Sequence, residues 1–115
     1  MSTRLSGAKY KSVFDRGRPF RGRLFAAWVL CSPDAGRQAG VVVSKKSFHD
    51  AVDRNRAKRI LREGFRLVAP QLAVDADWVL VGRASLRGKR TADVMDELRY
   101  VARKGGFLLK TEEPV

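Results

Sequence analysis

Hydrophobic residues recur at helical spacing in three segments of the chain. In the longest, residues 52–68, apolar side chains return every three or four positions, which is typical of an amphipathic helix with one buried face. We expect Asp50 or Asp53 to cap its start and Pro70 to stop it. Shorter helices are expected at residues 6–16, between Ser6 and Gly17, and at residues 91–104. The apolar positions that define the three helical faces are Tyr10, Val13 and Phe14, then Ala57, Ile60, Leu61, Gly64, Phe65 and Val68, then Val94, Leu98 and Val101.

Three other segments have the character of strands. Residues 24–31 are a continuous apolar run, residues 38–44 contain three consecutive valines, and residues 77–81, four apolar residues after Asp77, are expected to form a short buried strand. A strong turn signal separates the strand at residues 24–31 from the strand at residues 38–44. An antiparallel hairpin between these two strands is the expected pairing. Residues 18–23 are expected to form a basic loop or a short edge strand, because Pro19 cannot donate a ladder hydrogen bond.

The predicted element order is α-β-β-α-β-α, with a possible extra short edge strand. This order implies an α+β fold, a two-layer α-β sandwich with helices packed on a small mixed sheet. The chain has 115 residues, of which 44% are hydrophobic and 31% charged. That length and composition predict a single globular domain over residues 1–115.

The charge of the chain is strongly positive. Lys and Arg number 24 against 12 Asp and Glu, so the formal net charge is +12. Such an excess on one small domain indicates a polyanionic partner, with nucleic acid as the first candidate. No apolar run approaches the ~18 residues of a membrane span, residues 1–8 lack the apolar centre of a signal peptide, and Cys31 is the only cysteine. We therefore expect a cytoplasmic protein without a membrane partner.

Basic residues are concentrated on the long helix. With its apolar face turned inward, Arg54, Lys58 and Arg62 lie one above another at four-residue spacing, and we call them the cation row. Like charges at this spacing repel by a few tenths of a kcal/mol per pair, on the order of the effect in isolated helices. Phosphates would relieve that repulsion, so the row favours polyanion binding over the ordinary alternative of a merely solvated face. Its neighbours on the helix surface are Asn55, Arg59 and Arg66.

Aromatic side chains are interleaved with the basic segments. Rings beside cations are typical of proteins that bind single-stranded nucleic acid, where the rings stack on bases. Taken alone, Tyr10, Phe14 and Trp28 are each more typical of a core, and both interpretations stay open. Strand alternation places Trp28 with Leu24, Ala26 and Leu30, and the small Ala26 favours an open groove. In that case the three rings are partly exposed and approach Lys58 or Arg62.

Candidate catalytic groups are few. His49 is the only histidine, no nucleophile motif surrounds it, and we expect it in a solvated loop. The acidic residues of the second half stand at element ends, which suits caps and surface pairs better than a metal cluster; they are Asp75, Asp77, Asp93, Asp96 and Glu97. The sequence shows no residue that would carry a reaction itself.

Two motifs separated by seven residues resemble the signature of the protein subunit of bacterial ribonuclease P. The first is Val43-Ser44-Lys45-Lys46, at the end of a predicted strand. The second, on the long helix, is Arg54-Asn55-Arg56-Ala57-Lys58-Arg59-Ile60-Leu61-Arg62-Glu63. The resemblance runs over most of the chain, with further matches at Tyr10, Val13-Phe14, Gly17, the strand at 77–81 and Arg83. It departs from the family at residues 47–50, where many members have a glycine.

The resemblance implies an α-β sandwich with a left-handed βαβ crossover through the long helix. It also implies a ribonucleoprotein enzyme, an endoribonuclease whose large RNA subunit holds Mg²⁺ and cleaves precursor tRNA to release the 5′ leader. The protein would assist by binding the leader and the catalytic RNA. No organic cofactor, metal site or catalytic residue is implied for the protein itself.

Site residues carried over from the resemblance fall into two groups. The leader-binding cleft would be lined by Tyr10, Phe14, Trp28, Lys58 and Arg62. The catalytic RNA, or a metal ion near it, would be met by Ser44, Lys45, Lys46, Arg54, Asn55, Arg56 and Arg59, with Lys58 and Arg62 also binding RNA. The alternative function is a general RNA-binding or ribosome-associated protein without a catalytic role. Sequence-specific DNA binding is disfavoured, because Asn55 is the only base-reading side chain on the polar face.

Overall fold

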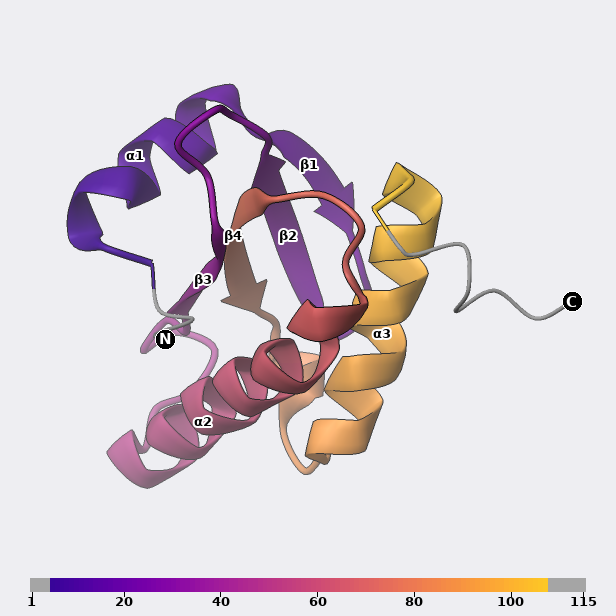
Figure 1. The fold of residues 1–115 in the computed structure, drawn as a ribbon. Helices are drawn as coiled ribbons and strands as arrows, with labels where there is room; N and C mark the ends of the chain where they lie inside the picture. Colours follow the sequence, from indigo (N-terminus) through magenta and orange to yellow (C-terminus); the bar gives the residue numbers. More distant parts are fainter. Residues whose placement is uncertain (1–4, 108–115) are drawn as a thin grey trace, which may run out of the picture.

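Three α-helices and four β-strands make up residues 5–107, the part of the chain that the computed structural model describes (Figure 1). The order matches the predicted one, with the optional edge strand present as β1. Residues 1–4, part of the stretch examined for a signal peptide, lie outside the described residues. The elements are α1 (Gly7–Arg16), β1 (Arg18–Arg21), β2 (Phe25–Leu30), β3 (Arg37–Val42), α2 (Ala51–Val68), β4 (Ala76–Gly82) and α3 (Thr91–Gly105), with 3₁₀ turns at Ala69–Gln71 and Ala84–Leu86.

The sheet has the strand order β1-β2-β4-β3. β2 is antiparallel to both β1 and β4, whereas β3 is parallel to β4. The predicted hairpin between β2 and β3 is therefore wrong, because β4 lies between them. β4 is buried on both faces except at Val81, and such a strand gains most from a central position. The connection at residues 31–36 easily spans the roughly 10 Å that two strand spacings require.

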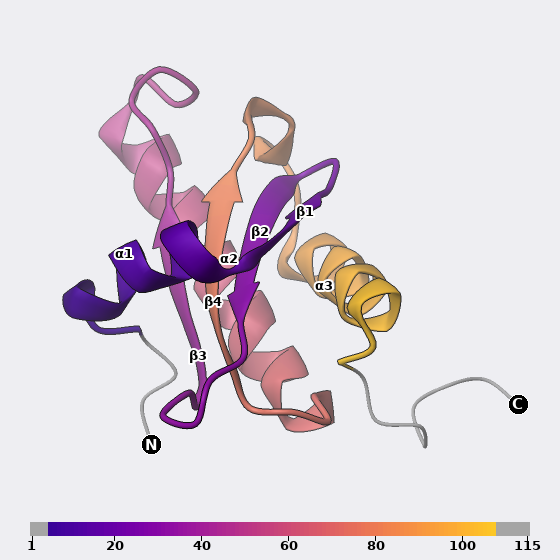
Figure 2. The ribbon, with the colours of Figure 1, turned by 90° about the horizontal axis from the view of Figure 1, so that it is seen from above.

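The unit β3-α2-β4 is a left-handed crossover. In Figure 2 both strands run upward, β4 lies to the right of β3, and α2 passes behind the sheet. About 98% of such connections are right-handed, so no pattern of hydrophobic residues predicts this arrangement. The handedness that the family resemblance implied is confirmed.

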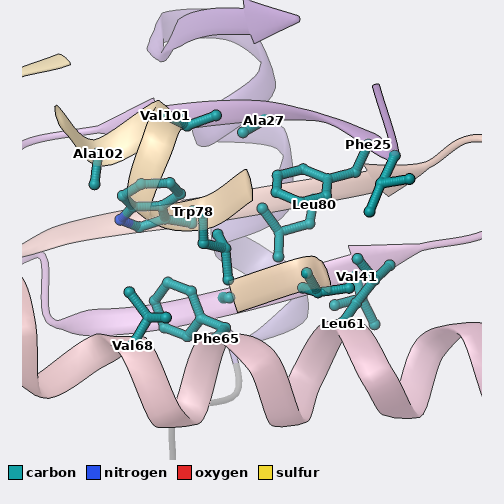
Figure 3. Close-up of a cluster of buried hydrophobic side chains, with 14 of the residues drawn as sticks. Phe25, Ala27, Val41, Leu61, Phe65, Val68, Trp78, Leu80, Val101 and Ala102 are labelled. Carbon is teal, nitrogen blue, oxygen red and sulfur yellow. The ribbon is translucent and has the colours of Figure 1, made fainter. Parts of the chain in front are cut away.

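The larger core lies between the sheet and the pair α2 and α3. It contains Trp78 and Leu80 from β4, Phe65 and Leu61 from α2, and Val101 from α3, each at most 1% exposed (Figure 3). The predicted inward faces of α2 and α3 are confirmed, because every position named for them is buried. This face supplies most of the apolar burial that stabilises the fold.

Within residues 5–107, the opposite face of the sheet is covered by α1 and by Leu5 just before it (Figures 1 and 2). Its fully buried cluster is small and consists of Leu5, Val13 and Val79. Around it lie half-buried side chains, including Tyr10 and Trp28. Leu24, expected on this face, instead belongs to the large core, because it precedes β2 and lies outside the strand alternation. The rings of interest thus lie on the thinly covered face.

The helices end at or next to the expected residues, but the expected capping hydrogen bonds of α1 and α2 are not formed. Ser6 and Asp50 occupy the N-cap positions of α1 and α2, but neither side chain makes a capping hydrogen bond. At α3, the Asp93 carboxylate accepts the main-chain N–H of Arg90 at 2.9 Å. Gly106 closes α3 with φ 79°, a left-handed conformation that glycine adopts without strain.

Candidate nucleic-acid interface

Three aromatic side chains lie on the thinly covered face of the sheet. α1 places Tyr10 and Phe14 one turn apart, and β2 supplies Trp28. The Phe14 and Trp28 rings meet edge to face, with their centroids 5.1 Å apart. Phe14 is 39% exposed, and Tyr10 and Trp28 are half-buried. The expected partial exposure of all three rings is confirmed, so a base could stack here.

Tyr10 is fixed against the edge strand β3. Its hydroxyl accepts the main-chain N–H of Val41 at 3.1 Å. Its ring lies across Gly40, where a Cβ atom would overlap the ring. Gly40 therefore makes room for Tyr10, a role that sequence reasoning missed. The available signal was a glycine directly before three valines.

A buried ion pair anchors α1 to the sheet. Lys9 Nζ lies 3.3 Å from a carboxylate oxygen of Asp77, whose residue is only 3% exposed. The same carboxylate accepts the N–H of Gly36 at 3.3 Å. Asp77 was expected to act as a cap or in a surface pair; it does form an ion pair, but its carboxylate is buried because β4 is central. Lys9 and Asp77 hold the helix that carries Tyr10 and Phe14.

The cation row lies on the flank of α2 that faces away from α3. Gly64 packs against Val94 of α3, which fixes the opposite flank. Arg54, Lys58 and Arg62 are half-buried beside the inward face, and α2 packs beneath the edge strand β3. Tyr10 lies on the other face of that strand, and Phe14 and Trp28 lie on the same face of the sheet at β2, beyond β4. Their approach to Lys58 or Arg62 remains a prediction.

The loop after β3 presents Ser44, Lys45 and Lys46 to solvent. The Phe48 N–H donates to the Ser44 carbonyl at 3.0 Å, and the Ser47 N–H donates to Ser44 Oγ at 3.1 Å. One terminal nitrogen of Arg54 donates to the carbonyls of Phe48 and His49, at 3.1 and 3.2 Å. Arg54 thus shapes this loop, and its contact with the catalytic RNA stays a prediction. His49 is exposed in the loop, as expected.

A cavity of about 350 Å³ lies between α2 and the start of α3. Arg56 and Arg59 line it from α2, and Arg90 lines it from the loop before α3. Glu63 is the only acidic lining residue, and Arg66 holds its carboxylate at 2.5 Å. That hydrogen bond lowers the pKa of Glu63 below its ordinary value. Within residues 5–107 the three lining arginines form no salt bridge, so the cavity presents positive charge; Arg90 was not singled out from the sequence.

A larger cavity, about 700 Å³, lies away from the rings, between the β1–β2 turn and α3. Arg21, Arg23 and Lys89 line it, but so do Asp93, Asp96 and Glu97, so the opposite charges offset one another. The Glu97 carboxylate accepts the main-chain N–H groups of Arg23, Leu24 and Phe25 at 2.9–3.2 Å. Its role is structural, where a surface pair was expected.

The described part of the chain has neither a cluster of metal-binding side chains nor a membrane-spanning helix. Residues 5–107 contain no group of three or more His, Cys, Asp or Glu side chains placed to hold a metal ion. None of the helices there is long and apolar enough to cross a membrane.

Comparison with known families decides between the two functions left open. The family model for ribonuclease P matches residues 3–105 of this chain. The chain belongs to the ribonuclease P protein family. Ribonuclease P is an endoribonuclease of tRNA processing, so the expected family and enzyme are confirmed.

Similar proteins agree with this assignment. The ribonuclease P protein component of Clostridium acetobutylicum is 31% identical over 111 residues, covering 94% of this chain and 92% of that protein. The component from Desulfovibrio desulfuricans is 37% identical over 103 residues, covering 83% and 78%. A solved structure of the Staphylococcus aureus RNase P protein superposes with a TM-score of 0.77 at 22% identity, covering 95% of this chain and 100% of that one. The Thermotoga maritima RNase P protein gives 0.74 at 23%, covering 88% and 96%, and both confirm the fold.

Proposed function

We propose that this ribonuclease P protein binds the catalytic RNA and the single-stranded 5′ leader of precursor tRNA, and so promotes removal of the leader. The observation that carries the proposal is that Tyr10, Phe14 and Trp28 are all partly exposed on the sheet face that α1 covers, with the rings of Phe14 and Trp28 in contact. Rings open to solvent suit an unpaired strand, whose bases are free to stack. A binder of duplex RNA would have no use for them.

The leader would follow the β3 side of the molecule. Tyr10 lies over this strand on one face, with Phe14 and Trp28 farther in over β2, and the cation row borders β3 on the other face. Bases would stack on Phe14 and Trp28 while phosphates meet Lys58 and Arg62, which is the division of labour usual in single-strand binding.

The catalytic RNA would meet the remaining basic surface. Lys45 and Lys46 are exposed at the end of β3, and Arg56 and Arg59 line the cavity beside α3. We add Arg90 to this group because it faces the same cavity. Ser44 directly precedes Lys45, and Arg54 and Asn55 directly precede Arg56, so we assign these three residues to the same RNA-binding surface.

Mg²⁺ would enter with the RNA. It prefers oxygen ligands, usually carboxylates, phosphates and water. The proposed RNA-facing residues are mostly cations, which repel a divalent metal, so they do not fit a metal site. The RNA phosphates are the suitable ligands, and the protein's cations would offset the remaining phosphate charge. The place of this assembly would be the cytoplasm.

Reconstitution with the cognate RNA tests the proposal. Cleavage is measured at low Mg²⁺, with and without the protein, on precursor tRNAs carrying a long leader or a single-nucleotide leader. We expect the protein to stimulate cleavage of the long-leader substrate more strongly. Equal stimulation of both would contradict leader binding, and RNA binding without any stimulation would favour a general RNA-binding protein. Phe14→Ala should reduce the difference in stimulation between the long-leader and single-nucleotide-leader substrates. Lys104 is an exposed cation on α3, so Lys104→Ala should leave that difference unchanged.

A further inference from the structure

We propose that Arg87 is a positioning residue that holds the Lys45–Lys46 loop in its RNA-binding shape. It lies about forty positions from this loop along the chain and was not among the site residues expected from the sequence. The proposal rests on the proposed RNA binding by Lys45 and Lys46, and it extends that function to a residue that need not touch RNA.

Two direct contacts join Arg87 to the loop. Its Nη2 donates to the Ser47 carbonyl at 2.9 Å. Its guanidinium carbon lies 5.1 Å from the centroid of the Phe48 ring, a cation–π contact. Phe48 is only 1% exposed and belongs to the large core. The guanidinium therefore connects the loop backbone to a side chain that cannot move freely.

Arg54 completes the arrangement from the other side. Arg54 donates to the carbonyls of Phe48 and His49, and Arg87 donates to the carbonyl of Ser47. Three consecutive loop carbonyls thus accept hydrogen bonds from two guanidinium groups. Residues 44–50 contain neither glycine nor proline, and no non-glycine residue of the described chain has a positive φ. Ser44 closes the start of this turn by accepting the Ser47 and Phe48 N–H groups, and the two guanidinium groups bind the three carbonyls that follow.

Arg87 is itself held in place, as a positioning residue must be. Leu86, the residue before it, is 1% exposed in the core. Gly88, the residue after it, has φ 78°, which turns the chain back. Within residues 5–107 no carboxylate forms a salt bridge with Arg87. Nothing on the described surface competes with the loop for its guanidinium.

The first measurement needs no RNA. Hydrogen exchange of the Lys46, Ser47 and Phe48 amides is compared among the wild-type protein, Arg87→Met and Lys89→Met. Methionine keeps much of the apolar length of arginine but donates no hydrogen bond. Lys89 is a matched control, an exposed cation two positions away whose side chain makes no hydrogen bond or salt bridge to this loop within residues 5–107. We expect several-fold faster exchange in Arg87→Met only, and unchanged exchange there would overturn the proposal.

The second measurement separates positioning from a direct phosphate contact. Binding of the catalytic RNA is measured for Arg87→Met, for the Lys45→Ala/Lys46→Ala variant, and for the combination. Loss of a charge-assisted hydrogen bond predicts about tenfold weaker binding in Arg87→Met. If Arg87 acts through the lysines, that loss disappears when they are absent. Additive losses would show that Arg87 contacts RNA itself and would overturn the proposal.

Two controls keep the outcomes distinct. If Arg87→Met fails to fold, as judged by thermal unfolding, Phe48→Leu replaces it, because leucine keeps the core filled while removing the ring under the guanidinium. The same exchange and binding results are then expected. If the wild-type protein does not bind the RNA at all, the proposed function fails, whereas the exchange experiment still decides whether Arg87 orders the loop.

Discussion

At the scale of single residues, the two tryptophans of the sheet have different tasks although both belong to apolar strands. Trp78 is 1% exposed among Phe65 and Phe107 in the large core. Trp28 lies on the other face, half-buried, with Phe14 at its edge. Strand alternation separates the faces, but only the structure shows which face is thinly covered.

Replacing Trp28 should therefore affect binding more than folding. In Trp28→Ala we expect the affinity for a single-stranded leader RNA to fall by about 1–3 kcal/mol, the usual loss for a stacking ring. Trp78→Ala, the matched control, should instead destabilise the fold by about 3–5 kcal/mol. Fluorescence anisotropy and thermal unfolding measure the two effects. Near-complete loss of folding in Trp28→Ala would place this ring in the core and remove it from the site.

Substitution of Gly40 tests whether the position of the Tyr10 ring contributes to the stability of the fold. A methyl group at Gly40 would overlap the Tyr10 ring, so Gly40→Ala should displace the ring or strain the sheet, costing about 1–3 kcal/mol of stability. At Gly36 an added Cβ would only make an ordinary 3.6 Å contact with Gln38. Gly36→Ala should thus unfold like the wild type. Identical unfolding temperatures for the two variants would show that Tyr10 yields without cost.

At the scale of elements, α3 is joined to the β1–β2 turn by one carboxylate. Glu97 accepts three consecutive main-chain N–H groups of that turn. Glu97→Ala leaves these donors without their partner, and we expect a loss of about 1–3 kcal/mol in the free energy of unfolding. Asp96, the adjacent residue, has a 79% exposed side chain that pairs only with Arg99, so Asp96→Ala should cost little. Chemical denaturation compares them, and equal losses would contradict the assignment.

The cation row on α2 predicts a salt effect on RNA binding. For each phosphate contact removed, the slope of log affinity against log salt should shrink by about 0.7–0.9. We expect this in Lys58→Ala and again in Arg62→Ala, whereas Lys104→Ala should leave the slope unchanged. Affinities measured over a range of KCl concentrations provide the slopes. Unchanged slopes in properly folded Lys58→Ala and Arg62→Ala would make the row a solvated face.

Elements could be predicted well because each carries its own pattern. The apolar stripe of α2 and the run that forms β4 are local properties, and both were located nearly to the residue. Contacts at a distance were not predictable in this way. Arg87 meets Ser47, and Glu97 meets Leu24, through positions that no spacing along the chain relates.

At the scale of the whole molecule, strand order was the main error of sequence reasoning. A short connection favours a hairpin, but burial on both faces puts β4 in the centre and moves β3 to the edge. The arrangement has a functional consequence, since the edge position of β3 brings Tyr10 on one face and the cation row on the other to the same border of the sheet, while Phe14 and Trp28 lie two strands away at β2. Tyr10 and the cation row could be identified from the sequence, but their shared location at the β3 border depends on the strand order, which the sequence does not reveal.

The two edge strands of the sheet, β1 and β3, also affect the tendency of the protein to aggregate. An open strand edge is a template on which another chain can add a strand, and such addition leads to aggregation. At β3 the Leu5 N–H donates to the Ala39 carbonyl and Tyr10 receives the Val41 N–H, so part of this edge is already occupied. At the other border, β1 is only four residues long and carries Arg18, Pro19 and Arg21. Both edges thus resist growth into a fibre.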